Sequence, residues 1–289
     1  MGRDRLTIAG EHARPPGAVG SIAVEGSIAF LARDGLIAVD FSDPASPREV
    51  GRLATRGSPA CIAVAGGRAF VGTDAGVEVI DVARPDALRH LGAVGDGDVF
   101  GVAADGERLL TSDREQVRAW TVPADVSGAR PRGACAAELA GRLTLRGDLA
   151  FAAADCEGMI VVDVADLDRP ARVGLFEGPG DVTRIALVGD RALLADYSGG
   201  LAVVDVSNPR RPRPLGSWEE GMVGDVAARG DRAYLAMGDL VVVDLTNPRR
   251  PREIGRHRVR EGDTAWGLDV ADGVVCAVGG AGASFFREA

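Results

Sequence analysis

Three charged residues at nearly constant spacing are the first candidates for chemistry in this sequence. Arg142 and Arg184 are 42 residues apart, and Asp225 follows 41 residues later. Two guanidinium groups held side by side can bind a carboxylate or phosphate through paired hydrogen bonds. Acid–base catalysis on an anionic substrate is also possible, with Arg142 and Arg184 holding the anion and Asp225 or Asp181 as the acid or base; Asp225, Asp181 and Arg184 are the catalytic candidates.

The composition excludes several other kinds of chemistry. All 33 basic residues are arginines, because the sequence contains no lysine, so Schiff-base and phosphate-loop lysines are ruled out. There are only three histidines, and no Gly-x-Ser-x-Gly segment marks a hydrolase nucleophile. The net charge of −9 argues against a nucleic-acid partner, which would favour a basic surface.

We expect neither a metal nor a cofactor. Residues 96–107 have acids at positions 1, 3 and 12 and glycine at position 6 of a calcium-binding loop, but Phe100 occupies position 5. The four cysteines lack Cys-x-x-Cys spacing. We expect Cys61 and Cys276 to be buried, and Cys135 and Cys156 to lie close enough to pair if the protein is exported.

Nothing in the sequence predicts a membrane segment. No stretch reaches the roughly 18 apolar residues of a membrane helix, and the N-terminus lacks the apolar core of a signal peptide. As written, the chain is expected to be soluble, cytoplasmic and monomeric, with no membrane partner; export would require that a signal peptide had been removed.

A repeat of 40 to 42 residues explains the spacing of the charged residues. In each unit a small or apolar residue lies near the start of a short strand that follows a glycine-containing turn, and we call this residue the anchor. The seven anchors are Ala29, Ala69, Leu109, Ala150, Ala192, Ala233 and Val275. Each unit contains four short apolar runs of four to six residues, separated by Gly, Pro, Asp and Asn, which is typical of strands. Seven units of four strands predict an all-β fold, a seven-bladed β-propeller of four-stranded blades.

The repeat predicts one domain over residues 1–289. Its blades span about 18–53, 58–94, 98–136, 139–176, 181–218, 222–257, and 263–287 plus 5–9. The seventh unit lacks a fourth strand. Residues 6–9 precede the anchor Ala29 by the same distance as residues 252–255 precede the anchor Val275. We therefore expect the N-terminal strand to complete the last blade and to leave no free sheet edge.

The third strand of the repeat and its following turn are similar to the LVIVD repeat of bacterial and archaeal proteins. The similarity is carried by residues 201–212 (LAVVDVSNPRRP) and 240–251 (LVVVDLTNPRRP), while residues 117–123 (VRAWTVP) depart from the pattern. The resemblance implies a propeller and no particular reaction. We expect the repeated aspartate, such as Asp205, to accept hydrogen bonds from the turn that Pro209 shapes.

The topology predicts a disc with two differently charged faces. Hairpins between second and third strands, and linkers into first strands, share a face that we call the top; they carry Asp34, Asp74, Asp113, Asp155, Glu157, Asp196, Asp96, Asp98, Asp181, Asp225 and Asp263. Turns between third and fourth strands lie at the bottom and carry Arg48, Arg84, Arg130, Arg169, Arg210, Arg211, Arg249 and Arg250. Solubility accounts for these surface charges more simply than a charged partner does, and both interpretations stay open.

At one depth of the channel, the equivalent residues of the seven blades differ in type. Eight residues before each anchor lie, in blade order, Ser21, Cys61, Gly101, Arg142, Arg184, Asp225 and Gly267. Blades four to six thus replace small residues by charged ones. We expect Asp98, Asp181, Phe100 and Trp266 on the same rim, with the two aromatic residues forming an apolar wall.

Three functions remain open from the sequence. The first is a non-catalytic scaffold that binds a protein or a small anionic ligand at the acidic top face and channel mouth. The second is an isomerase, lyase or cyclase with its active site at that mouth, and the third is a surface or adhesion module. A closed Arg–Asp cluster favours interaction, whereas unpaired arginines beside an aromatic residue favour ligand binding or catalysis.

Overall fold

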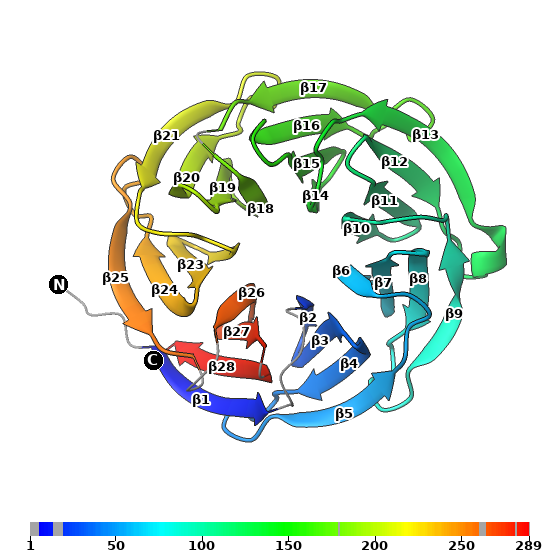
Figure 1. Ribbon diagram of the computed structural model, residues 1–289, viewed down its shortest axis with the longest axis horizontal. Coiled ribbons are helices and arrows are strands. Elements are labelled where there is room, and N and C mark those ends of the chain that lie inside the picture. Colours follow the sequence, from blue (N-terminus) through cyan, green and yellow to red (C-terminus); the bar gives the residue numbers. More distant parts are fainter. Residues whose placement is uncertain (1–5, 14–19, 179, 260–263, 281, 289) are drawn as a thin grey trace.

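Seven four-stranded antiparallel sheets stand in a ring around a central channel (Figure 1). The computed structural model describes residues 6–13, 20–178, 180–259, 264–280 and 282–288. The seven-bladed β-propeller predicted from the repeat is confirmed. Within the described residues the only helix is η1, a 3-10 turn over Val126–Gly128.

The first two strands of each blade build the inner part of the ring. The innermost strands, in blade order, are β2 (Ser21–Glu25), β6 (Pro59–Ala65), β10 (Gly101–Asp105), β14 (Leu143–Arg146), β18 (Val182–Val188), β22 (Asp225–Arg229) and β26 (Ala265–Ala271). The second strands are β3 (Ile28–Arg33), β7 (Arg68–Thr73), β11 (Arg108–Ser112), β15 (Leu149–Ala153), β19 (Arg191–Asp196), β23 (Arg232–Met237) and β27 (Val274–Gly279).

The third and fourth strands form the outer part. The third strands are β4 (Gly35–Asp40), β8 (Gly76–Asp81), β12 (Gln116–Thr121), β16 (Met159–Asp163), β20 (Gly200–Asp205), β24 (Asp239–Asp244) and β28 (Gly282–Glu288). The fourth strands are β5 (Arg48–Leu53), β9 (Arg89–Val94), β13 (Arg130–Ala136), β17 (Ala171–Phe176), β21 (Arg213–Trp218), β25 (Arg252–His257) and, for the seventh blade, β1 (Leu6–Ala13).

The N-terminal strand closes the ring, as predicted. β1 pairs antiparallel with β28 from Leu6 opposite Glu288 to Ala13 opposite Gly282, so the seventh sheet has the order β1-β28-β27-β26. The strand runs to Ala13, four residues beyond the predicted end at Ala9; past a register shift between Ile8 and Gly10, its pairing continues to Gly282, the first residue of β28. The chain therefore closes the ring without a covalent link.

The apolar core lies between neighbouring blades. Buried residues of blades seven and one, for example, form one cluster in which Phe41 stacks on Phe285 with ring centroids 5.3 Å apart. A single sheet cannot cover both of its apolar faces, so each blade depends on its two neighbours. Stacking seven of them buries a continuous core and leaves the innermost strands to face the channel.

The turn after the third strand repeats one hydrogen-bonding arrangement. Asp205 Oδ1 accepts the N–H of Ser207 at 2.9 Å, and Asp244 Oδ1 accepts the N–H of Thr246 at 2.8 Å. Hydrogen bonds from the Ser207 hydroxyl and N–H hold the pKa of Asp205 below its ordinary value. The structural role predicted for the repeated aspartate is confirmed.

The proline of the same turn fixes the contact with the preceding blade. A Cβ on Gly174, in β17, would lie 2.0 Å from the carbonyl oxygen of Pro209. Gly51, in β5, approaches the carbonyl oxygen of Pro85 equally closely. Only glycine permits this approach of two backbones, so the outer strand of one blade and the turn of the next are matched to each other.

Candidate functional site

Seven residues at one depth line the top of the channel, one from each blade. Their partners on the second strand are equivalent, as in Ser21 opposite Ala32 and Asp225 opposite Ala236. Blades one to three and seven contribute small, buried residues there, and blades four to six contribute Arg142, Arg184 and Asp225. The common depth predicted from the repeat is therefore present in the backbone register.

Arg184 and Asp225 form an ion pair between blades five and six. Their closest atoms, Arg184 Nε and Asp225 Oδ1, are 3.3 Å apart. The carboxylate also accepts the N–H of Val226 at 2.7 Å and, through Oδ2, the N–H of Leu268 in the seventh blade at 3.0 Å. Asp225 thus satisfies two backbone donors of the innermost strands and ties three blades together.

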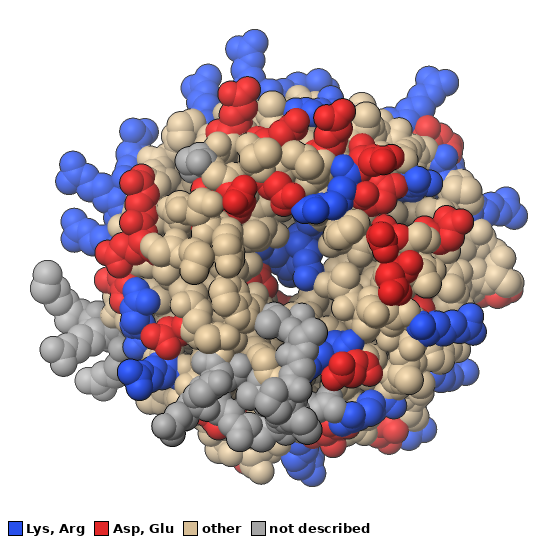
Figure 2. Space-filling view, viewed as in Figure 1, with Lys and Arg blue, Asp and Glu red and all other residues tan. Residues whose placement is uncertain are grey.

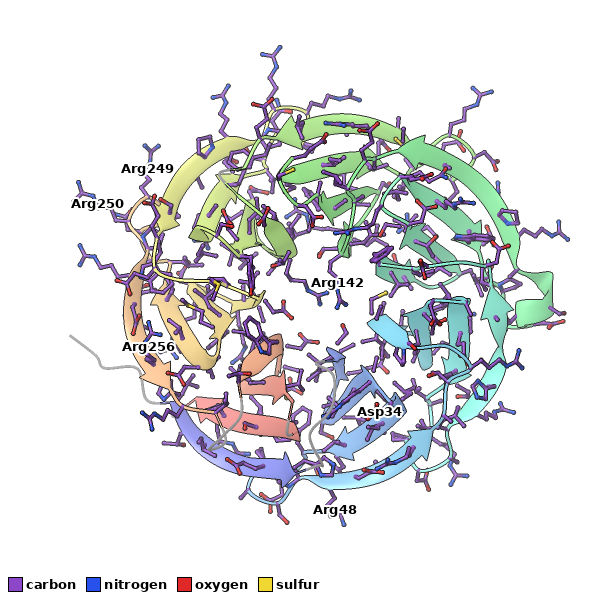
Figure 3. All side chains as sticks on the ribbon, viewed as in Figure 1. Asp34, Arg48, Arg142, Arg249, Arg250 and Arg256 are labelled. Atoms are coloured by element: carbon purple, nitrogen blue, oxygen red, sulfur yellow. The ribbon has the colours of Figure 1, made fainter. Side chains whose placement is uncertain are left out.

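Arg142 crosses the channel instead of joining this pair. It lies directly before β14 and points into the channel (Figure 3), and its Nη1 donates to Ser21 Oγ, in the first blade, at 2.7 Å. Burial lowers the pKa of the Arg142 guanidinium, and the positive charge of Arg184 lowers it further. Ser21 was not predicted as a partner from the sequence, because the small residues at this depth were interpreted only as packing residues.

Cys61 is the thiol nearest to these cations. Burial raises its pKa to about 11, although the charges of Arg142 and Arg184 act in the opposite direction. Its Sγ donates to the carbonyl oxygen of Val99 at 3.6 Å. A thiol with this pKa is a poor nucleophile near neutral pH, so Cys61 packs as a small apolar residue, as predicted.

Asp269, one step deeper in the channel, was missed by sequence reasoning. Six residues before each anchor, five blades carry alanine, the fourth carries Thr144 and the seventh carries Asp269. Asp269 Oδ2 accepts the N–H of Val24 in the first blade at 2.7 Å, and burial raises its pKa. The sequence does contain the indication, because Asp269 differs in type from the residues six positions before the other anchors.

The two predicted aromatic residues lie at the same depth but in different surroundings. Trp266 covers Gly224, next to Asp225, so closely that a Cβ on Gly224 would be 2.7 Å from Trp266 Cε3. Its ring centroid is 6.2 Å from that of Tyr197, an exposed residue. Phe100 instead lies under the Arg114 guanidinium, 5.0 Å from the ring centroid. Trp266 is thus the aromatic residue beside the charged cluster.

The remaining predicted acids lie on the exposed rim. Asp181 Oδ2 accepts the hydroxyl of Ser198 at 3.1 Å. Asp98 is exposed and, among the described residues, has no hydrogen bond or ion pair. The structure thus brings Arg142, Arg184 and Asp225 together and leaves Asp98 and Asp181 at the surface.

Figure 2 looks onto the top face and shows acidic side chains spread around the channel opening, with basic atoms inside it. Several of these acids are paired, for example Asp113 with Arg118 at 3.0 Å. Asp263, also predicted on this face, lies outside the described residues. The bottom-turn arginines are exposed, and Arg48, Arg249 and Arg250 point outward from the ring in Figure 3.

Other features add no second centre. Within the described ranges, no group of three His, Cys, Asp or Glu side chains is placed to hold a metal ion. In those same ranges no helix has the length and apolar character needed to cross a membrane. All four cysteines are free thiols, with Cys61 and Cys276 buried; the closeness of Cys135 and Cys156 stays a prediction.

Comparisons with known proteins agree with the propeller fold. The LVIVD repeat family matches three segments, residues 16–55, 179–218 and 220–259. No curated protein matches the sequence. Among solved structures, U3-55K is similar with a TM-score of 0.79 at 13% identity over 100% of both chains. The WD40 repeats of RRP9 give 0.78 at 14% identity over 98% of this chain and 97% of that one.

A computationally designed protein, Ika8, is also similar, with a TM-score of 0.67 at 11% identity over 100% of both chains. At these identities the solved structures establish the fold alone. The matched segments contain the aspartate-capped turns of the first, fifth and sixth blades. The chain is therefore a seven-bladed β-propeller in which three segments match the LVIVD repeat.

Proposed function

We propose that this propeller binds a small ligand with a carboxylate or phosphate group at the top of its channel, between Arg142 and Arg184. The supporting observation is the unequal pairing of these two cations. Arg184 faces the carboxylate of Asp225 at 3.3 Å, whereas Arg142, among the described residues, donates to the neutral hydroxyl of Ser21 and has no ion pair. An anion at this depth would give Arg142 a charged acceptor.

The charge balance of the channel supports the same proposal. Asp225 pairs with Arg184, Arg142 has no ion pair among the described residues, and burial raises the pKa of Asp269, which disfavours its charged form. A part-buried cation without a charged partner costs free energy, which a bound anion would recover. Each guanidinium offers five donors, more than Asp225 and Ser21 can accept.

The rim restricts the kind of anion. Asp96, Asp98 and Asp181 are exposed residues of the linkers that lead into first strands, on the same face as the channel cluster, so a polyanion would meet like charges on its approach. A ligand with a single anionic group avoids most of this repulsion. Trp266 and Tyr197 offer an apolar surface beside the cluster for the rest of such a ligand.

The enzyme alternative needs a carboxylate that is free to exchange a proton. Asp225 already accepts two backbone N–H groups and faces Arg184, so its oxygens are engaged in holding the blades together. Asp181 lies on the exposed rim and accepts the Ser198 hydroxyl. A general binding or scaffold role, which the propeller fold supports, therefore takes precedence over catalysis.

Calorimetric titration with inorganic phosphate and with acetate tests the proposal and separates the two anion classes. We expect at least one of these anions to bind the wild-type protein, and Arg142→Gln to weaken that binding about tenfold or more through loss of a charge-assisted contact. Arg184→Gln should weaken it as well. The bound anion should raise the melting temperature of the wild type, and at the same anion concentration it should raise that of Arg142→Gln less.

Arg146→Gln is the matched control. Arg146 lies at the far end of β14, the strand that directly follows Arg142, and its guanidinium donates to the carbonyl of Gly189, away from the cluster. The substitution changes the net charge equally, so it should leave anion binding unaltered. Absence of binding by both anions, or wild-type affinity in Arg142→Gln, would overturn the proposal.

A further inference from the structure

A cavity on the fifth blade has the charge opposite to that of the channel cluster. It lies at the top of the blade, between the β19–β20 hairpin and the segment that follows β21, and has a volume of about 360 Å³. Asp196 and Ala202 form its buried floor, and the exposed residues Ser217 and Glu219 form part of its rim. Two acidic side chains and no basic one line it.

The carboxylate of Asp196 is buried and only half satisfied. The residue is 1% exposed, and its Oδ1 accepts the N–H groups of Ser198 at 2.8 Å and Gly199 at 3.0 Å. Among the described residues, its Oδ2 has no hydrogen-bond partner. Leaving a buried carboxylate oxygen without a donor costs free energy, so this side of the site favours a cation or a strong donor.

The third blade contains the same arrangement with its donor in place. Asp113 Oδ1 accepts the N–H groups of Glu115 and Gln116, each at 3.0 Å, just as Asp196 does in its own hairpin. Its second oxygen, Oδ2, lies 3.0 Å from Arg118 Nη2 and 3.1 Å from Arg118 Nε. In this blade both carboxylate oxygens are therefore satisfied, the second by a guanidinium from the neighbouring strand.

Strand register shows what the fifth blade has in place of that arginine. Arg118 pairs with Thr111, two residues after the anchor Leu109, and Ala202 pairs with Leu194, two residues after the anchor Ala192. Ala202 thus occupies the position of Arg118. The cavity beside Asp113 and Arg118 measures about 20 Å³, against about 360 Å³ beside Asp196 and Ala202.

We infer that the cavity on the fifth blade binds a guanidinium group, supplied by an arginine side chain of a peptide or protein partner. The bound group would take the place that Arg118 fills in the third blade and donate to Asp196 Oδ2. A guanidinium fits better than an ammonium because its planar N–H fork can reach two acceptors at once, here Asp196 and the rim carboxylate of Glu219.

A neighbouring cavity explains why we assign the guanidinium to a peptide chain. About 690 Å³ in volume, it shares Ala202, Ser217 and Glu219 with the first cavity. It continues along β21 of the fifth blade and reaches Phe176 and Glu177, at the end of β17 in the fourth blade. Together the two cavities form a groove between blades four and five with apolar and acidic walls. Such a groove can accept residues on either side of an anchoring arginine.

Binding of N-acetyl-L-arginine amide, measured by calorimetry or by chemical-shift titration, tests the inference. The wild-type protein should bind this probe in the millimolar range and should not bind the neutral isostere N-acetyl-L-citrulline amide. Asp196→Asn should weaken binding about tenfold or more, because the amide can accept one hydrogen bond but carries no charge.

Ala202→Arg is a second variant that does not remove the carboxylate. It supplies the missing guanidinium from within the chain, so it should fill the cavity, abolish binding of the probe and raise the melting temperature. Asp113→Asn is the matched control, because it alters the equivalent aspartate of a blade whose site is already filled. That variant should bind the probe as the wild type does.

The outcomes separate this inference from the anion site in the channel. Asp196→Asn should leave phosphate or acetate binding unchanged, and Arg142→Gln should leave binding of the arginine probe unchanged. Equal binding of the arginine and citrulline probes, or undiminished binding in Ala202→Arg, would overturn the inference. Binding of Ca²⁺ but not of the arginine probe, lost in Asp196→Asn, would also overturn it and identify a metal site instead.

Discussion

The outer turns and the innermost strands belong to the same seven blades, yet only the outer turns repeat closely. On the outside, one aspartate caps the turn and a proline carbonyl sits against a glycine of the preceding blade, as in Asp205 and the Pro209–Gly174 contact. On the inside, equivalent positions hold residues as different as Gly101, Arg142 and Asp225.

The difference follows from what each region packs against. The outer turn is wedged between two backbones, so a change of residue there meets a neighbour at once. The inner strand has one edge on the channel, where a side chain can extend without displacing the core. Arg142 uses this freedom to reach Ser21 across the opening. Binding groups can therefore be introduced on the inside at a smaller cost in packing.

The same contrast holds between two hairpins of the top face. In the third blade Arg118 satisfies the second carboxylate oxygen of Asp113, whereas the fifth blade has Ala202 at the register position of Arg118. Both hairpins keep the backbone hydrogen bonds that shape the turn. Local structure is thus preserved where the site changes, which is how one repeat can carry different ligands on different blades.

Removal of the closing strand should have the largest effect, because it breaks the outer ring at the one point where the chain ends meet. Deleting residues 1–13 removes the whole β1–β28 ladder and the buried side chain of Leu6. We expect the melting temperature, followed by circular dichroism, to fall by about 10 °C or more. Adding a peptide of residues 1–13 should recover part of the loss; an unchanged melting temperature in the truncated protein would refute closure by β1.

A pair of glycine substitutions compares the outer and inner regions directly. Gly174→Ala would place a methyl group 2.0 Å from the Pro209 carbonyl oxygen, so it should lower the free energy of unfolding by about 1–3 kcal/mol. Gly141→Ala, at the channel, meets nothing closer than the Ala153 carbonyl oxygen at 3.5 Å and should change stability by less than about 0.5 kcal/mol. Urea denaturation of both variants measures the difference, and equal losses would show that the two regions are equally constrained.

The sequence was sufficient to predict the fold, because the fold depends on features that recur. Each unit of 40 to 42 residues contains short apolar strands separated by turns, and five of the seven units carry the aspartate that caps the outer turn. Even the closure by residues 6–9 could be deduced from matching distances. The depth of Arg142, Arg184 and Asp225 followed from the same period. Because the seven units of the repeat can be aligned with one another, equivalent positions can be compared within a single sequence.

The partners within the site were not predictable in the same way. Arg142 bonds to Ser21, 121 residues away and across the channel, and no spacing in the sequence indicates which opposite blade a long side chain reaches. Asp196 appeared only as one more acid of the top face. Its half-satisfied carboxylate became visible when the register placed Ala202 where the third blade has Arg118.

The smallest effect should come from the charge of an outer turn. Hydrogen bonds from the Thr246 hydroxyl and N–H lower the pKa of Asp244 from 3.8, so its carboxylate stabilises the folded state above that pH and loses this contribution as the pH falls below it. Asp244→Asn should cost about 0.5–1 kcal/mol at pH 7, since the group is partly exposed and the amide oxygen can still accept from Thr246.

The stability of Asp244→Asn relative to the wild type should depend on pH in one direction. The difference in free energy of unfolding should stay constant above about pH 5 and shrink as the pH is lowered through and below 3.8, because the wild-type carboxylate then becomes protonated. Thr246→Ala keeps the carboxylate and removes one donor, so it should show part of the same loss at pH 7. A difference that grew toward low pH would contradict the lowered pKa and, with it, the role of the charged aspartate as the acceptor that shapes the outer turn.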